Sequence, residues 1–202
     1  MVSEPRVRPA LELVRAPADL ELAARCVAGE HAAQRLLFER ERGRVQAVLF
    51  RIVGPGAHLD DLLQDAFVEI FRSLDTFRGE ASLSTWVTRC TVRVAYDHFR
   101  RKSRVPRLEP VTDLEAALPS AEQRVLHREA ARRLYALLDR LKPAQRIAFT
   151  LHALDGKALK DVASLMDASV VATKLRVYRA RVLIERSAKN DPLLREFVRE
   201  AD

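Results

Sequence analysis

One stretch, residues 59–104, most constrains the fold, because it passes from an acidic amphipathic helix through a polar loop into a basic helix. Its first part carries apolar residues three and four positions apart, which is the spacing of one helix face and not of a strand. These positions are Leu62, Leu63, Ala66, Phe67, Ile70 and Phe71. The pattern predicts a helix that begins near Leu59 and buries one side.

A row of acidic residues lies on another face of this helix. Asp61, Asp65 and Glu69 recur every four residues and therefore share one face. Asp60 adds negative charge to the first turn, where the helix dipole favours it. Such a row is typical either of a solvated face or of a surface that offers carboxylates to a partner.

The loop and the basic helix that follow suit a polyanion. Residues 76–85 contain Gly79 and several hydroxyl residues, and a helix is predicted over 83–102 with the only tryptophan, Trp86, near its start. The cations of this segment are Arg89, Arg93, Arg100, Arg101, Lys102 and Arg104. Cations in a last turn also stabilise a helix C-terminus. The five cations from Arg93 to Arg104 exceed what that role needs.

Helices are predicted on both sides of this stretch. Asp19 opens a helical pattern that ends at Gly29, and a longer helix runs from about Glu30 to the helix-breaking Gly54-Pro55-Gly56. In the second half we expect helices over about 121–140, 144–154, 159–166, 170–186 and 193–198.

Residues 159–186 have the pattern of a helix-turn-helix, a short helix and a longer basic helix joined by a tight turn. Asp167 tolerates the left-handed backbone that such a turn requires, and Ser169 can cap the helix that follows. The second helix of such a pair enters the major groove of DNA. Three helices packed for stability, with a solvated basic face, are the alternative interpretation.

The predicted fold is all-α, with two small helical domains joined by a flexible linker, the C-terminal one a helix-turn-helix. Residues 106–120 contain three prolines and no sustained period, which is typical of a linker. We expect a flexible lead over 1–18, a first domain over 19–105, the linker over 106–120 and a second domain over 121–202.

Composition narrows the class of function. The net charge is +7 and the pI about 9.9, which favours a polyanionic partner. Cys26 and Cys90 form no C-x-x-C pair, no apolar run approaches the roughly 20 residues that span a bilayer, and the N-terminus lacks an apolar signal core. We expect a cytoplasmic protein without membrane insertion. The five histidines are scattered and there is no Gly-rich phosphate loop, so we expect no enzyme, no cofactor and no metal.

In order and spacing, the motifs resemble those of the extracytoplasmic-function sigma factors, the small bacterial initiation subunits of RNA polymerase of the sigma-70 family. The resemblance covers nearly all of residues 19–189. The first domain is similar to sigma region 2 in residues 61–67, in residues 77–87, and in Asp97 with Arg100 and Arg101. The second is similar to region 4 in residues 141–146, 161–163 and 179–181.

The resemblance implies an alternative-type sigma factor that binds core RNA polymerase, recognises promoter DNA and initiates transcription. The residues implied to bind core polymerase are Asp61, Leu62, Gln64, Asp65 and Phe67. Those implied to bind and melt the minus-10 element are Arg78, Thr85, Trp86, Arg89, Arg93, Arg100 and Arg101. Those implied to bind the minus-35 element are Lys174, Leu175, Arg176, Tyr178 and Arg179. The implied partners are the β′ clamp helices and β flap of the polymerase, promoter DNA and an anti-sigma factor.

The chain departs from the family at the start of the recognition helix. The family usually has Gly-Thr-Val-Lys-Ser there, and this chain has residues 171–175 as Val-Ala-Thr-Lys-Leu. Minus-35 recognition is therefore expected to be weak or to use apolar contact with a thymine methyl group. Ala158 also stands where the family often has a serine N-cap, and Trp86 is as compatible with core packing as with base capture.

The competing interpretation is a helix-turn-helix regulator that acts without core polymerase, its first domain serving dimerisation or sensing. It predicts DNA binding without polymerase binding. The acidic helix beside a loop of the melting type argues against it.

Overall fold

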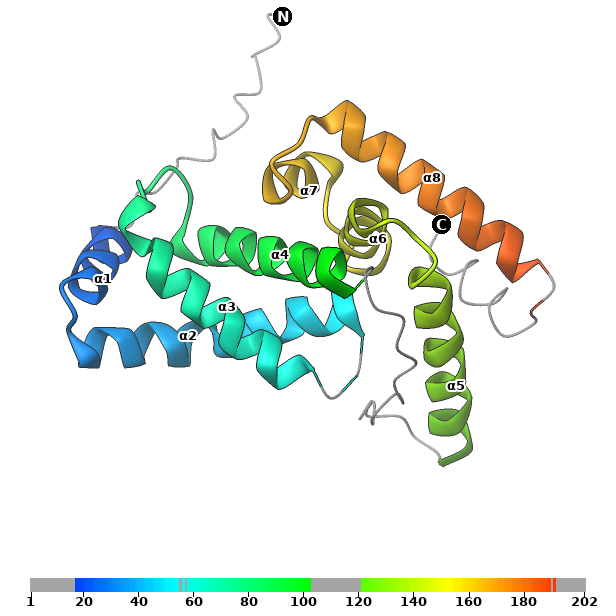
Figure 1. Ribbon diagram of the computed structural model, residues 1–202, viewed down its shortest axis with the longest axis horizontal. Coiled ribbons are helices and arrows are strands. Elements are labelled where there is room, and N and C mark those ends of the chain that lie inside the picture. Colours follow the sequence, from blue (N-terminus) through cyan, green and yellow to red (C-terminus); the bar gives the residue numbers. More distant parts are fainter. Residues whose placement is uncertain (1–16, 55, 57, 103–120, 190, 192–202) are drawn as a thin grey trace, which may run out of the picture.

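The computed structural model describes residues 17–54, 56, 58–102, 121–189 and 191, and every regular element in these ranges is a helix (Figure 1). The first module contains α1 (Pro17–Val27), α2 (His31–Val53), α3 (Leu59–Ser73), the 3-10 turn η1 (Leu74–Thr76) and α4 (Leu83–Lys102). The second contains α5 (Ala121–Leu138), α6 (Pro143–Phe149), the π-helical turn η2 (Thr150–Leu154), α7 (Leu159–Leu165) and α8 (Val170–Ala188). The predicted all-α class is confirmed.

Three predicted segments fall largely outside the described residues. They are the lead over 1–18, of which only the last two residues are described, the linker over 106–120 and the helix over 193–198. The same applies to the end of the cationic run at Arg104. Among the described residues, no helix combines the length and the apolar character needed to cross a membrane.

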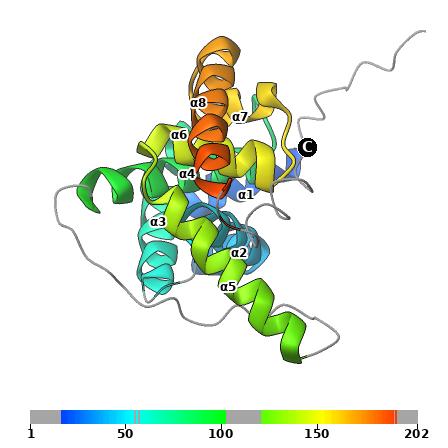
Figure 2. The same cartoon turned by 90° about the vertical axis from the view of Figure 1, so that its right-hand side faces the viewer.

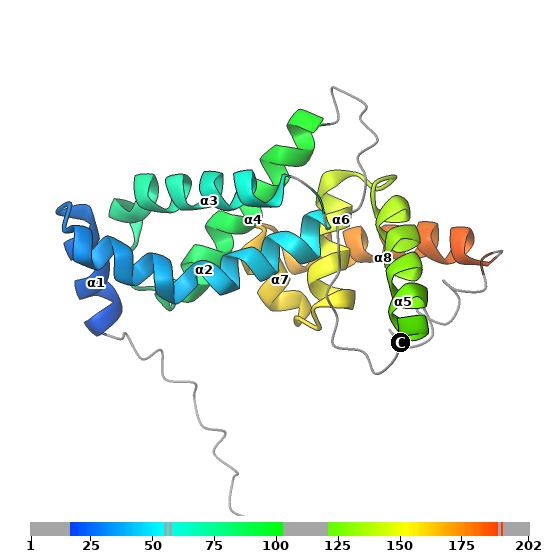
Figure 3. The same cartoon turned by 90° about the horizontal axis from the view of Figure 1, so that it is seen from below.

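The first module is built around α2, α3 and α4, with α1 across one end (Figures 1 and 3). The apolar face predicted for α3 is buried, Ala66 and Ile70 completely, except that Phe71 is only partly buried. It packs with Leu37, Leu49 and Ile52 of α2 and Val87 of α4 in one core. Asp61 and Asp65 of the acidic row are thereby exposed, and Glu69 is partly buried and pairs with Arg72 at 2.5 Å.

The start of α4 is fixed by a residue far away in the sequence. Asp19 of α1 accepts a hydrogen bond from the backbone N–H of Leu83 at 2.8 Å, and its other carboxylate oxygen pairs with Arg40 at 2.8 Å. Ser82 accepts from the N–H of Thr85 at 3.2 Å. These bonds satisfy N–H groups that have no partner inside a helix, and the carboxylate also suits the positive end of the helix dipole. The loop before α4 is therefore anchored where it ends.

A buried carboxylate joins α2 to α4. Glu41 is only 1% exposed and accepts from the hydroxyl of Ser84 at 2.6 Å. Arg40 and Arg44 pair with it at 2.9 and 3.1 Å. A buried charge is tolerated only when it is paired in this way. The sequence gives no sign of this burial, because Glu41 lies in a run of charged residues typical of a surface.

The second module contains the predicted helix-turn-helix, with α7 and α8 side by side (Figure 2). Asp167 has a φ of 48°, as the turn requires. Ser169 caps α8 by accepting from the N–H of Ala172 at 3.1 Å. Ala158 occupies the N-cap of α7 and makes no side-chain cap bond. All three local predictions are confirmed.

The two modules pack against each other. Ile147, Leu151, Val162 and Leu165 of the second module belong to the same buried cluster as the core of α2 and α4. A smaller cluster around Leu138 and Ile184 lies within the second module alone. The sequence predicts two modules, and the contact between them is a finding of the structure.

Candidate polymerase and nucleic-acid surfaces

The exposed edge of α3 carries the carboxylates predicted to bind polymerase. Asp61, Gln64 and Asp65 are exposed, and Val68 continues this surface with 66% of its area accessible. Leu62 and Phe67, predicted as part of the same set, are 3% and 5% exposed and pack into the core. They hold α3 in place, and only the polar residues are available to a partner. The apolar spacing used to predict the helix already separates the two groups.

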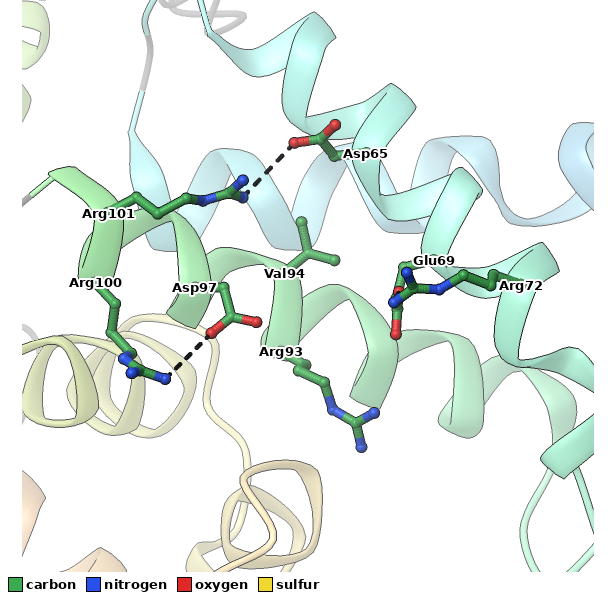
Figure 4. A pocket seen from close by; sticks show the side chains of 8 residues that line it. All are labelled: Asp65, Glu69, Arg72, Arg93, Val94, Asp97, Arg100 and Arg101. Atoms are coloured by element: carbon green, nitrogen blue, oxygen red, sulfur yellow. Dashed lines mark hydrogen bonds and ion pairs between the residues drawn. The ribbon is translucent and has the colours of Figure 1, made fainter.

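A groove of about 530 Å³ lies between α3 and α4, and Figure 4 shows the charged side chains that line it. Arg101 of α4 pairs with Asp65 of α3 at 3.8 Å, and Arg100 pairs with Asp97 at 3.8 Å. Arg93 points away from these carboxylates (Figure 4). Pairs this long between exposed side chains contribute about 0–1 kcal/mol. The arginines can therefore exchange these partners for phosphate at little cost.

A second hollow, of about 420 Å³, adjoins the loop before α4. Phe77 and Trp86 line it and meet edge to face, with 5.8 Å between ring centres. Arg78 and Arg89 also line it. An aromatic wall beside guanidinium groups suits an unstacked base and its phosphate. Trp86 is half-buried, so it packs against the core and still contributes to the wall.

The loop at this hollow is shaped by a glycine. Gly79 has a φ of 70°, a conformation that other residues rarely adopt, and a Cβ there would lie 3.1–3.2 Å from the side chain of Leu20. Thr85 is exposed in the first turn of α4, where its hydroxyl lies 2.9 Å from that of Ser82 at the end of the loop. The loop is thus held close to α1 while Arg78 and Thr85 face solvent.

The two cysteines are buried. Burial raises the pKa of the Cys90 thiol, and burial also raises the pKa of Cys26. Both thiols are therefore protonated and unreactive at neutral pH. This agrees with a structural role for each.

The outer face of α8 exposes apolar side chains beside its cations. Val171, Leu175 and Tyr178 are 79%, 45% and 63% exposed. Lys174 and Arg179 are exposed with them, whereas Thr173, Val177, Ala180 and Ile184 are buried as predicted. Arg176, predicted to bind DNA with the others, is only partly exposed and faces α4 across a hollow of about 310 Å³. Residues two apart do not share a helix face, so the spacing from Lys174 to Arg176 already carried this signal.

Comparison with known proteins agrees with this arrangement. Residues 37–105 match the model of Sigma-70 region 2, and residues 131–184 match that of Sigma-70, region 4. The chain is 30% identical over 187 residues to the ECF RNA polymerase sigma-E factor of Escherichia coli K12, covering 88% of this chain and 96% of that protein. It is 29% identical over 186 residues to the sigma-E factor of Haemophilus influenzae, covering 87% and 97%.

Two solved structures are similar in fold. CnrH, in complex with the cytosolic domain of CnrY, superposes with a TM-score of 0.59 at 26% identity, over 86% of this chain and 99% of that one. The sigma factor RpoE of Bartonella quintana, in complex with the anti-sigma factor NepR, gives 0.57 at 20% identity, over 78% and 97%. With the matches to regions 2 and 4 in their expected order, the chain belongs to the ECF family of RNA polymerase sigma factors, which bind core polymerase, recognise promoter DNA and initiate transcription.

Proposed function

We propose that two adjoining edges of the first module bind core polymerase and promoter DNA. Asp61, Gln64 and Asp65 of α3 contact the clamp helices of the polymerase β′ subunit. Arg93, Arg100 and Arg101 of α4 hold the backbone of the minus-10 element. The observation that carries this proposal is the meeting of both edges in one groove, where Asp65 and Arg101 lie 3.8 Å apart.

The hollow beside the loop receives an unpaired base of the non-template strand. Trp86 and Phe77 provide the aromatic wall, Arg89 and Arg78 contact the phosphates, and Thr85 faces the strand from the first turn of α4. A base leaves its stack at a cost of a few kcal/mol, which the pocket and phosphate contacts offset. Melting is then the capture of a base that has opened.

The second module contacts the minus-35 element through α8. Lys174 and Arg179 contact phosphates or base edges, while Leu175, Tyr178 and Val171 contact thymine methyl groups, the apolar feature of the major groove. Arg176, facing α4, is left out of this set. The same module meets the β flap of the polymerase.

Further features of the chain follow from the family. The domain limits are 19–105 and 121–202, joined by residues 106–120. Sigma factors are non-enzymatic initiation factors, so the chain itself catalyses nothing and acts in the cytoplasm with its polymerase. The structures of CnrH and RpoE contain CnrY and the anti-sigma factor NepR, respectively. Because this chain is similar to both in fold, it too is proposed to bind an anti-sigma factor.

Transcription in vitro from a library of random promoters tests the proposal. With core polymerase and this chain, we expect transcripts from templates that share a minus-10 element and a thymine-containing element about two helical turns upstream. Transcripts that need core polymerase but share no upstream element would remove α8 from recognition. No transcripts beyond those of core polymerase alone would contradict the assignment as a whole.

A further inference from the structure

The C-terminal end of α2 is completed by the second module. The last four carbonyl groups of a helix have no partner inside it. In α2 they include the carbonyls of Arg51, Ile52 and Val53, whereas that of Phe50 already accepts from the N–H of Gly54 at 2.8 Å. The hydroxyl of Tyr135 lies 3.2 Å from the carbonyl oxygens of Phe50 and Arg51. Arg146 donates to those of Ile52 and Val53, from Nε at 2.8 Å and from Nη2 at 2.6 Å.

Arg146 is built into this contact. It is 2% exposed, and its guanidinium lies 4.5 Å from the ring centre of Phe99 in α4 and pairs with Asp139 in its own module. A guanidinium stays charged even when burial lowers its pKa, and the negative end of the α2 dipole favours a cation at this position. The charge is thus fully satisfied only while the modules touch.

The fit around this contact is close. The ring of Tyr135 lies on Gly54, where a Cβ atom would come within 2.7 Å of it. Arg51 of α2 pairs with Asp155, the residue after η2, at the edge of the same interface. Figures 1 and 3 both place the end of α2 beside α6. Together with the shared apolar cluster, these contacts define one specific docked arrangement.

The contact between the modules also involves Arg89, a residue proposed to bind DNA. Arg89 of α4 donates from Nη2 to the hydroxyl of Ser164 in α7 at 3.0 Å. Ser164 is itself part of the wall of the hollow that contains Trp86. Asp61 and Asp65, on the edge of α3, remain exposed in this docked arrangement.

We propose that the free protein holds itself closed through Arg146 and Tyr135, and that the helix-turn-helix module and the minus-10 strand compete for the Arg89 side of α4. The closed form leaves the edge of α3 and the Arg100–Arg101 end of α4 exposed, and it covers the Arg89 side of α4. Closure rests on the contacts alone, and the competition rests in addition on the function proposed for Arg89 and Trp86.

Closure is tested on the full chain without DNA. X-ray scattering gives the radius of gyration, and acrylamide quenching of Trp86, the only tryptophan, reports access to the covered hollow. Arg146→Met should raise the radius of gyration by about 5 Å, as expected when two compact modules separate, and should increase quenching. Tyr135→Phe and Arg51→Gln should shift both quantities in the same direction by less.

Arg25→Gln is the matched control, because it breaks an exposed ion pair, with Glu30, inside the first module. It should change neither quantity. Circular dichroism on each variant shows whether the helices remain. A wild-type protein as extended as folded Arg146→Met, or the same compact dimensions for all variants, would overturn the proposal.

Competition is tested with a fluorescent mixed-sequence single-stranded 12-mer. Arg146→Met and Ser164→Ala should bind it more tightly than wild type, the first by several-fold and the second by less, and both should bind core polymerase normally. Equal affinity in wild type and in an opened Arg146→Met protein would overturn the competition. Absence of DNA binding in every variant, even with polymerase present, would instead contradict the function proposed for α4, while scattering still decides closure.

Discussion

The two predicted DNA surfaces use different chemistry. The α3–α4 groove is lined by four arginines, of which Arg100 and Arg101 form long, exposed ion pairs that are easily exchanged. The outer face of α8 has two exposed cations beside Val171, Leu175 and Tyr178. Phosphate contacts give affinity that falls with salt, whereas apolar base contacts do not. The comparison therefore predicts a first module that holds DNA by charge and a second that distinguishes sequence by shape and methyl groups.

The largest effect is expected at the carboxylate edge of α3. Asp65→Arg should weaken binding to core polymerase roughly 100-fold or more, since a like charge set against a partner site costs several kcal/mol. Asp65 is exposed, so the fold should be unchanged. Competition for core polymerase against a labelled wild-type chain measures this effect.

Glu39→Arg is the control for that change, because Glu39 is an exposed acid on α2 away from the groove. It should leave polymerase binding within about two-fold of wild type. Equal losses in both variants would mean that net charge, and not the α3 edge, determines binding.

The next effect concerns the salt dependence of the first module. Arg100→Ala with Arg101→Ala should weaken binding to single-stranded DNA and reduce the slope of log K against log salt by about 0.7 for each lost contact. Fluorescence anisotropy titrations at salt concentrations from about 50 to about 200 mM measure the slope, because log K falls linearly with log salt in this range. An unchanged slope would show that these arginines do not touch phosphate.

A smaller effect should separate apolar from charged contacts on α8. Leu175→Ala should weaken duplex promoter binding by about 1 kcal/mol without changing the salt slope. Arg179→Ala should weaken binding and also lower the slope by about one. If Leu175→Ala were without effect on an intact and on a scrambled minus-35 element alike, the apolar account of α8 would be wrong.

The smallest effect is expected from charges that the second module uses internally. Glu129 pairs with Arg132 and Arg133, and the hydrogen bonds from these arginines lower its pKa to about 2. Because the folded pKa lies below the unfolded value of about 4.3, the pair stabilises the fold above that value, and this contribution is lost as the pH falls toward 2.

Glu129→Gln should therefore be slightly less stable than wild type at pH 7. The difference should shrink between about pH 4 and about pH 2, because Glu129 of the wild type becomes protonated over this range. Urea unfolding of both proteins over this range measures it. Promoter binding should not change. A difference that grew on acidification would contradict the assigned direction of the pKa shift.

Much of the fold could be predicted because local signals agreed with the final packing. The spacing of apolar residues in 62–71, the left-handed backbone at Asp167 and the Ser169 cap each act within one turn of chain, and the structure has all three. Such signals do not depend on which other segments lie nearby.

The buried charges could not be predicted in this way. Glu41 and Arg146 are almost fully buried, yet in sequence each lies where a surface residue is expected. Their burial depends on partners more than 40 positions away, Ser84 for the first and the carbonyls of Ile52 and Val53 for the second. The contact between the modules was not predicted for the same reason.

In the candidate sites, the structure separates residues that the motifs group together. Leu62, Phe67 and Arg176 match the family's motifs, but the structure turns the first two into the core and the third toward α4. Helix periodicity applied residue by residue would have separated these three from Asp65 and Lys174.

Gel filtration of the intact protein with bacterial core RNA polymerase tests the central claim most directly. The account predicts co-elution at a stoichiometric ratio, and its loss in Asp65→Arg. A folded wild-type protein that elutes apart from the polymerase would contradict the account and would favour a helix-turn-helix regulator that binds DNA without it.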